Sequence, residues 1–169
     1  MGDSLSVRQA VVDTVSRLCR SFDEHDWAAM RSCLADMLAT DYSSFRGTQP
    51  ARLTVEEFVR LRRSALEGLR TQHLCFNHLV IIESERAHCR RDFIIHRWPE
   101  QTDDTRFFHT YGYYHYDLVS PAEAIWLIES IVQFATHSEG SPELHGALRP
   151  THQTPPPTAP EPTATAPSI

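Results

Sequence analysis

Apolar residues recur at helical spacing in three stretches of the N-terminal part of the chain. The first stripe consists of Val11, Val15, Leu18 and Phe22. The second follows Asp26, which can cap a helix, and consists of Trp27, Met30, Leu34 and Leu38. The third follows the capping-box pair Thr54 and Glu57 and consists of Val55, Phe58, Val59, Ala65, Leu66 and Leu69. The spacing therefore predicts three amphipathic helices that pack on a common core.

From Thr71 onward the apolar period changes from helical to two, which is typical of strands. The predicted strands span 74–83, 87–98, 105–119 and 125–136. Residues 83–86 are typical of a turn and predict a hairpin between the first two strands. A short extended segment is also predicted at 39–45, before a loop at 47–50. Helices followed by antiparallel strands predict an α+β fold, with helices on one face of a curved, mostly antiparallel sheet that encloses a pocket.

Composition divides the chain into a folded part and a tail. The chain has 169 residues, of which 41% are hydrophobic, enough for one compact domain over residues 1–140. Residues 141–169 are rich in Pro and Thr, and we expect this tail to be disordered. As an alternative, its first turns around Leu144 and Leu148 could fold over the mouth of a pocket.

The charged residues exclude several classes of function. The 16 basic residues, all of them arginines, face 22 acidic ones, a balance that argues against nucleic acid as a partner. Without lysine, the chain cannot use Schiff-base chemistry, pyridoxal phosphate or a phosphate-loop lysine. No signal segment or membrane span is recognisable, so we expect a soluble, cytoplasmic protein with no membrane partner.

Cysteine and histidine spacing gives no sign of a metal site. Cys19, Cys33, Cys75 and Cys89 lie in apolar runs without a C-x-x-C pair, which predicts reduced, buried thiols. The histidines of the folded part show no local H-x-x-x-H pattern; those considered are His73, His96, His109 and His115. We therefore expect no metal site.

Asp23 is the first candidate for chemistry, because it follows the apolar face of the first predicted helix directly. An acid buried there would need a hydrogen-bonding or cationic partner. Alternatively, Asp23 only solvates the end of the helix. The choice depends on which side chains the strands bring to this helix end.

Two histidines on neighbouring predicted strands are candidate partners. Period-two alternation places His73 on one face with Cys75 and Asn77. On the next strand it places His96 on one face with Ile94 and Asp92. A hairpin between these strands could bring both imidazoles into one cavity, where an acid that reaches one of them would create a general base. Tyr42 could polarise a substrate carbonyl, or it could be a core residue, and the aromatic run 107–116 could be sheet packing.

Several segments together resemble scytalone dehydratase in order and spacing. They are Phe22-Asp23 with His25-Asp26-Trp27, Asp41-Tyr42-Ser43-Ser44-Phe45, Glu57-Phe58, Leu69-Arg70-Thr71-Gln72-His73, and His96. The similarity covers about residues 8–137. It implies the cone-shaped superfamily that also includes nuclear transport factor 2, ketosteroid isomerase, limonene epoxide hydrolase and the polyketide cyclase SnoaL.

The resemblance implies a cofactor-independent dehydratase, a carbon–oxygen lyase that acts on a hydroxylated polyketide-type ring in fungal secondary-metabolite biosynthesis. Asp23 and His96 would form the acid–histidine pair, His73 would be the partner base or acid, and Tyr42 would polarise the carbonyl. The alternatives are an isomerase or cyclase on the same scaffold, or a non-catalytic module that binds a small molecule. Scytalone dehydratase is trimeric and other members of the superfamily are dimeric, so the resemblance implies a homo-oligomer.

The expected substrate-binding residues are Phe22, Trp27, Phe45, Phe58, Leu66, Asn77, Tyr113 and His115. The chain departs from the resembled family in two places. Phe22 stands where the family has a second water-holding tyrosine, so the reaction and the substrate could both differ. On the fourth strand, where the family has serine and asparagine, either Tyr113 and His115 or Tyr116 and Leu118 face the pocket, depending on the placement of a gap.

Overall fold

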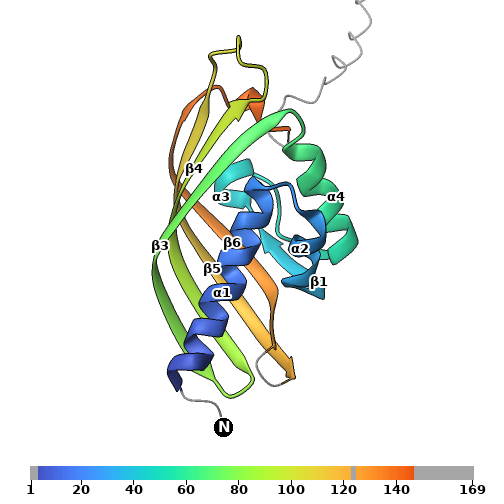
Figure 1. Ribbon diagram of the computed structural model, residues 1–169, viewed down its shortest axis with the longest axis vertical. Coiled ribbons are helices and arrows are strands. Elements are labelled where there is room, and N and C mark those ends of the chain that lie inside the picture. Colours follow the sequence, from blue (N-terminus) through green and yellow to red (C-terminus); the bar gives the residue numbers. More distant parts are fainter. Residues whose placement is uncertain (1–3, 123–124, 147–169) are drawn as a thin grey trace, which may run out of the picture.

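The computed structural model of the protein describes residues 4–122 and 125–146. Its helices are α1 (Ser4–Asp23), α2 (Trp27–Ser32), α3 (Ser43–Arg46), α4 (Val55–Ala65) and the short 3-10 helix η1 (Pro142–Leu144). Its strands are β1 (Leu34–Asp41), β2 (Ala51–Thr54), β3 (Leu69–Glu83), β4 (Arg86–Pro99), β5 (Phe108–Ala122) and β6 (Ile125–Gly140). Figure 1 shows α1 lying lengthwise against one face of the sheet, with the other helices on the same side.

The strands form one open, curved sheet in the order β2-β1-β6-β5-β4-β3. All neighbouring strands pair antiparallel except β1 and β6, which pair parallel. The expected α+β architecture, with helices on one face of a mostly antiparallel sheet, is therefore confirmed.

The apolar stripe of α1 forms the centre of the core. Val11, Val15 and Leu18 have almost no exposed surface and pack with residues of the inner sheet face. Asp23 ends the helix, His25 turns the chain with a φ of 53°, and the Asp26 side chain accepts a hydrogen bond from the backbone N–H of Ala29 to cap α2. This corner brings the end of α1 close to the sheet.

The second predicted helix is wrong in its C-terminal half. The helix α2 ends at Ser32, and Leu34 and Leu38 lie in β1 beside β6. Both leucines are buried. Residues four apart share a face in a strand as well as in a helix, so the spacing of the two leucines fits either element. The parallel pairing with β6 makes this segment a strand.

The hairpin predicted around residues 83–86 is confirmed as the β3–β4 turn. The face alternation predicted for β3 fails at a bulge between Phe76 and Leu79. Asn77 adopts a φ of 56° there, a left-handed conformation that asparagine tolerates. As a result, the residues before and after the bulge do not follow one continuous alternation.

The first residues of the predicted tail are packed against the domain. Residues 141–146 include η1, and Leu144 and His145 are both buried. Leu144 packs with Leu66, Leu69 and Phe108. The alternative in which the first turns of the tail cover a pocket therefore applies to residues 141–146, whereas Leu148 lies outside the described residues. Within the described parts, no helix is long and apolar enough to cross a membrane.

Candidate active site

A buried aspartate–histidine pair joins the end of α1 to β3. Asp23 Oδ1 lies 2.6 Å from His73 Nδ1 and accepts a hydrogen bond of 2.7 Å from the Thr71 hydroxyl. Asp23 Oδ2 accepts a further bond of 2.8 Å from the backbone N–H of His73. The two side chains are only 18% and 6% exposed, respectively. Asp23 is therefore a paired, largely buried acid and not a solvating helix end.

These contacts set the ionisation of Asp23 and the orientation of the imidazole. Burial raises the pKa of Asp23, but the hydrogen bonds and charge of His73 and the Thr71 hydroxyl outweigh it, so the pKa lies below its usual value. With Nδ1 held by the carboxylate, Nε2 is the ring nitrogen that remains for a substrate. Phe22 stacks on the same ring, with centroids 5.1 Å apart, and fixes its plane. The pair has the arrangement of a general base oriented by an acid.

His73 lines a small, partly open cavity of about 30 Å³ between the helices and the inner face of the sheet. This volume holds about two water molecules. The other lining residues are Phe22, Tyr42, Phe45, Arg46, Arg62, Ala65, Leu66, Ile95, Arg97, Tyr114, Gln133 and His145. Four of the residues predicted for the site from the sequence therefore line this cavity beside His73, namely Phe22, Tyr42, Phe45 and Leu66.

Three lining residues that the sequence reasoning missed are arginines. Arg62 and Arg97 are 7% and 3% exposed, and Arg46 is partly buried. The guanidinium carbons of Arg46 and Arg62 lie 4.3 and 5.0 Å from the ring centroid of Tyr42. Arginine is usually a surface residue, so its type gave no reason to place it inside. The alternation of β4 could have predicted the burial of Arg97, because this residue lies on the same face of the strand as Phe93 and Ile95.

The predicted pair of Asp23 with His96 is wrong. His73 is paired with Ile95 across the β3–β4 ladder, whereas His96 is opposite Gln72 on the other face of the sheet. There the His96 ring lies against His109 and Trp98, at centroid distances of 4.2 and 5.4 Å. Neighbouring residues on a strand point to opposite faces, so the two imidazoles cannot share the cavity.

Three predicted substrate-binding residues also lie on the outer face. Asn77, turned outward by its bulge, donates a hydrogen bond of 2.9 Å to Asp92. Tyr113 is opposite Asp92 in the β4–β5 ladder, and His115 is opposite Arg90. The register thus resolves the open question on this strand in favour of Tyr116 and Leu118, which are directed inward and buried together with Tyr114.

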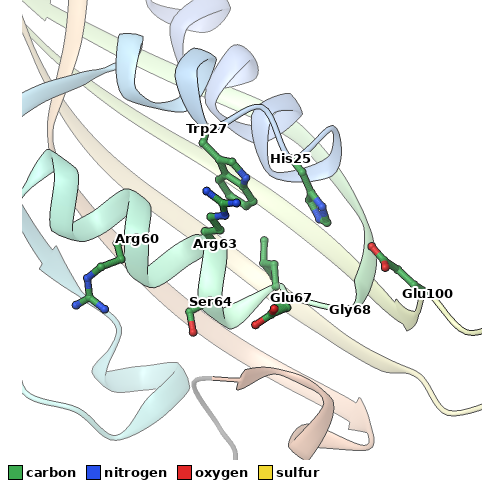
Figure 2. A pocket seen from close by; sticks show the side chains of 9 residues that line it. His25, Trp27, Arg60, Arg63, Ser64, Glu67, Gly68 and Glu100 are labelled. Carbon is green, nitrogen blue, oxygen red and sulfur yellow. The ribbon is translucent and has the colours of Figure 1, made fainter.

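Two other predicted binding residues lie near the cavity without lining it. Phe58 is fully buried in the core, beneath the guanidinium group of Arg62 at 5.1 Å. Trp27 lines a separate, open groove of about 510 Å³, together with residues of α4 and Glu100. Figure 2 shows this groove, with Arg60, Arg63 and Ser64 projecting from α4. It is larger than the cavity, but the aspartate–histidine pair does not line it.

Leu66 lines both the groove and the cavity. It is 4% exposed and follows the last turn of α4. Its side chain therefore forms part of the wall between the open groove and the cavity that contains His73.

A fourth buried arginine lies behind the pair. Arg91 is fully buried, and its Nη2 donates to Cys19 Sγ at 2.6 Å and to the Tyr116 hydroxyl at 2.8 Å. Cys19 Sγ lies 3.4 Å from Cys75 Sγ. A hydrogen bond from Cys75 and the charge of Arg91 outweigh burial and lower the pKa of Cys19 to about 5. All four cysteines are free, as predicted, and Cys75 is the one that is only half-buried.

The cavity is lined by aromatic rings, arginines and two histidines, and this donor set does not resemble a metal centre. In the two described ranges, 4–122 and 125–146, no three His, Cys, Asp or Glu side chains gather closely enough to hold a metal ion.

Comparison with protein families identifies the family of the chain and supports the fold. A model of the SnoaL-like domain matches residues 3–132. The chain belongs to the SnoaL-like domain family. The match begins at α1, contains Asp23 and His73, and ends within β6. Comparison with curated protein sequences finds no match to this SnoaL-like chain.

Solved structures with low sequence identity share the fold of this SnoaL-like protein. The Kfla4162 protein from Kribbella flavida has a TM-score of 0.75 and 20% identity, over 81% of this chain and 95% of that chain. A candidate scytalone dehydratase from Novosphingobium aromaticivorans has a TM-score of 0.68 and 12% identity, over 79% and 87%. The hexachlorocyclohexane dehydrochlorinase LinA-type3 from Novosphingobium barchaimii has a TM-score of 0.66 and 11% identity, over 83% and 94%. The nuclear transport factor 2-like fold is thereby confirmed.

Proposed function

We propose that this SnoaL-like protein is a cofactor-independent lyase that removes water from a hydroxylated ring substrate. The observation that carries the proposal is the Asp23–His73 pair, which places an oriented imidazole at the wall of a small, partly open cavity. Two structural neighbours have names that denote eliminations, a dehydratase and a dehydrochlorinase. A polyketide-type ring in secondary metabolism remains the expected substrate class.

The elimination requires one base and one group that polarises a carbonyl. His73 Nε2 takes a proton from a carbon next to the substrate carbonyl, and the electrons of the C–H bond form an enolate. The Tyr42 hydroxyl donates a hydrogen bond to the enolate oxygen. Collapse of the enolate forms the carbon–carbon double bond and breaks the bond to the leaving hydroxyl group, which departs as water with the proton held by His73. Asp23 stabilises the imidazolium between these steps.

An isomerase or cyclase is the second candidate function, and the position of His96 supports it. Because His96 lies on the outer face, it cannot assist a leaving group in the cavity. A single imidazole that accepts a proton at one carbon can also return it to another carbon without loss of water.

Mass spectrometry of the product separates these reactions. The full-length protein is incubated with hydroxylated ring ketones, and we expect a product lighter than the substrate by one water. His73→Gln removes the base and is expected to abolish the reaction, while circular dichroism shows that the variant is folded. An unchanged product mass would indicate isomerisation or cyclisation instead. A ligand that binds and is recovered unchanged would contradict both reactions and favour a binding module.

A further inference from the structure

The cavity beside His73 contains an excess of buried positive charge. Arg46, Arg62 and Arg97 all line it, and none of the lining residues is an Asp or Glu. Across residues 4–122 and 125–146, no carboxylate lies within ion-pair distance of these three arginines. Arg97 donates one hydrogen bond, of 2.8 Å, to the Thr110 hydroxyl. The Nε atoms of all three are buried and have no hydrogen-bond partner within the described residues.

The positive charges in the cavity disfavour one another. Burial, followed by the charge of Arg62, lowers the pKa of Arg46 to about 10. Burial also lowers the pKa of Arg97 to about 10. The pKa of His145, at the cover of the cavity, lies well below its usual value because of burial and then because of the same three arginines. Buried charges without counter-charges are destabilising, and proteins keep such features mainly where function requires them.

We propose that the substrate of this site carries a carboxylate, which binds among Arg46, Arg62 and Arg97. The proposal that an anion binds here does not depend on the proposed reaction, whereas identifying that anion as the substrate rests on the proposed function. A bound carboxylate supplies the missing counter-charge and accepts hydrogen bonds from guanidinium groups whose Nε atoms have no partner within the described residues. The substrate class is therefore a hydroxylated carboxylic acid.

Size favours a carboxylate over a phosphate. The cavity of about 30 Å³ has room for about two water molecules. A planar carboxylate has two oxygens and matches this volume, whereas a tetrahedral phosphate has four.

The position of the arginines also affects the chemistry. His73 lines the same small cavity, so an anion held by the arginines lies next to the base. Guanidinium groups at this place also stabilise the negative charge that develops when His73 removes the proton from the carbon next to the substrate carbonyl. Binding of the anion and activation of the C–H bond thus use the same positive potential.

The test compares two probes of nearly equal shape, acetate and acetamide, by NMR titration of the ¹⁵N-labelled full-length protein at low salt. We expect acetate to bind at least roughly tenfold more tightly than acetamide and to shift the Nε–H signals of the three arginines. Sodium chloride at the same concentrations controls for ionic strength. Equal binding of acetate and acetamide would overturn the proposal, as would inorganic phosphate binding more tightly than acetate at the same arginines.

Substitutions assign the binding to the arginines. Arg97→Met and Arg46→Met are each expected to remove the preference for acetate. Arg90→Met is the matched control, because Arg90 is on β4 but lies on the outer face over Tyr113. It is expected to keep the preference. Retained preference in both Arg97→Met and Arg46→Met would refute the assignment.

Stability of the ligand-free variants provides a second readout. Loss of an uncompensated buried cation is expected to leave the melting temperature unchanged or raise it, whereas loss of a structural arginine lowers it. Asp23→Asn separates the two proposals, since it should bind acetate normally while losing turnover. If acetate binds as expected and hydroxylated carboxylic acids are not converted, the anion site stands and the proposed function fails.

Discussion

Two aspartate–histidine pairs in this protein have the same short contact in different surroundings. His73 Nδ1 and Asp23 Oδ1 are 2.6 Å apart, as are His88 Nδ1 and Asp117 Oδ1. The inner side chains are 6% and 18% exposed, whereas the outer ones are 52% and 44% exposed. Water screens and competes with the outer contact, while burial strengthens the inner one. A short distance alone therefore does not mark an acid–base site; enclosure and the cavity beside it do.

The largest expected difference between the pairs is in turnover. Asp23→Asn removes the charge that orients and stabilises the His73 imidazolium, and we expect the rate to fall by about 10²–10⁴-fold. Asp117→Asn makes the same change at the surface and should leave the rate unchanged. Steady-state kinetics with the substrate that the wild-type protein dehydrates measures both rates. Equal rates for the two variants would remove the functional distinction between the pairs.

The next largest difference is in stability. Asp23→Ala leaves the backbone N–H of His73 and the Thr71 hydroxyl without their acceptor, so we expect a loss of about 1–3 kcal/mol in the free energy of unfolding. The corresponding surface change, Asp117→Ala, is expected to cost less than about 0.5 kcal/mol. Urea unfolding followed by circular dichroism gives both values. An equal cost at the two sites would contradict the difference in burial.

The inner pair also has a defined pH window. The pKa of Asp23 is lowered in the folded protein, so its stabilising effect is fully present above the ordinary carboxyl pKa of about 4 and is lost as pH falls through the folded pKa. We expect the stability advantage of wild type over Asp23→Asn to shrink as pH falls below about 4. Unfolding curves at several pH values below about pH 5 test this. An advantage that grows as pH falls below about 4 would have the wrong sign.

The smallest expected effect concerns the outer pair itself. A double-mutant cycle on His88 and Asp117 should give a coupling energy of about 0.2–1 kcal/mol, and added salt should reduce it further because both groups are solvated. The cycle uses His88→Ala, Asp117→Ala and the double variant in urea unfolding. A larger coupling that salt does not change would show that exposure is a poor guide to the strength of these contacts.

Sequence reasoning located the inner pair only in part. It identified Asp23 as a candidate because the acid follows an apolar helix face. It identified His73 because this histidine lies on a predicted strand that neighbours the strand of His96. It could not decide which face of β4 is directed inward, since Phe93, Ile94 and Ile95 are all apolar. The full strand held more information: Ala87, Cys89, Phe93 and Ile95 share one parity, which is the opposite parity to His96.

Other differences arose from features that alternation cannot report. The left-handed conformation of Asn77 breaks the period of β3 and turns that side chain outward. Buried arginines were not expected, because their cost depends on neighbours that the sequence does not place together. By contrast, the helix face of α1, the β3–β4 hairpin and the α+β class follow from periodicity and turn residues, which are local signals.

The wall formed by Leu66 has a consequence for how this scaffold can change. One side chain stands between a space that suits a small anion and a groove of about 510 Å³. A single shortening substitution such as Leu66→Ala would join the two, so that a larger molecule could keep its charged end at the arginines and extend its other end outward. The range of accepted substrates can thus broaden in one genetic step, while the acid, the base and the sheet that holds them stay unaltered.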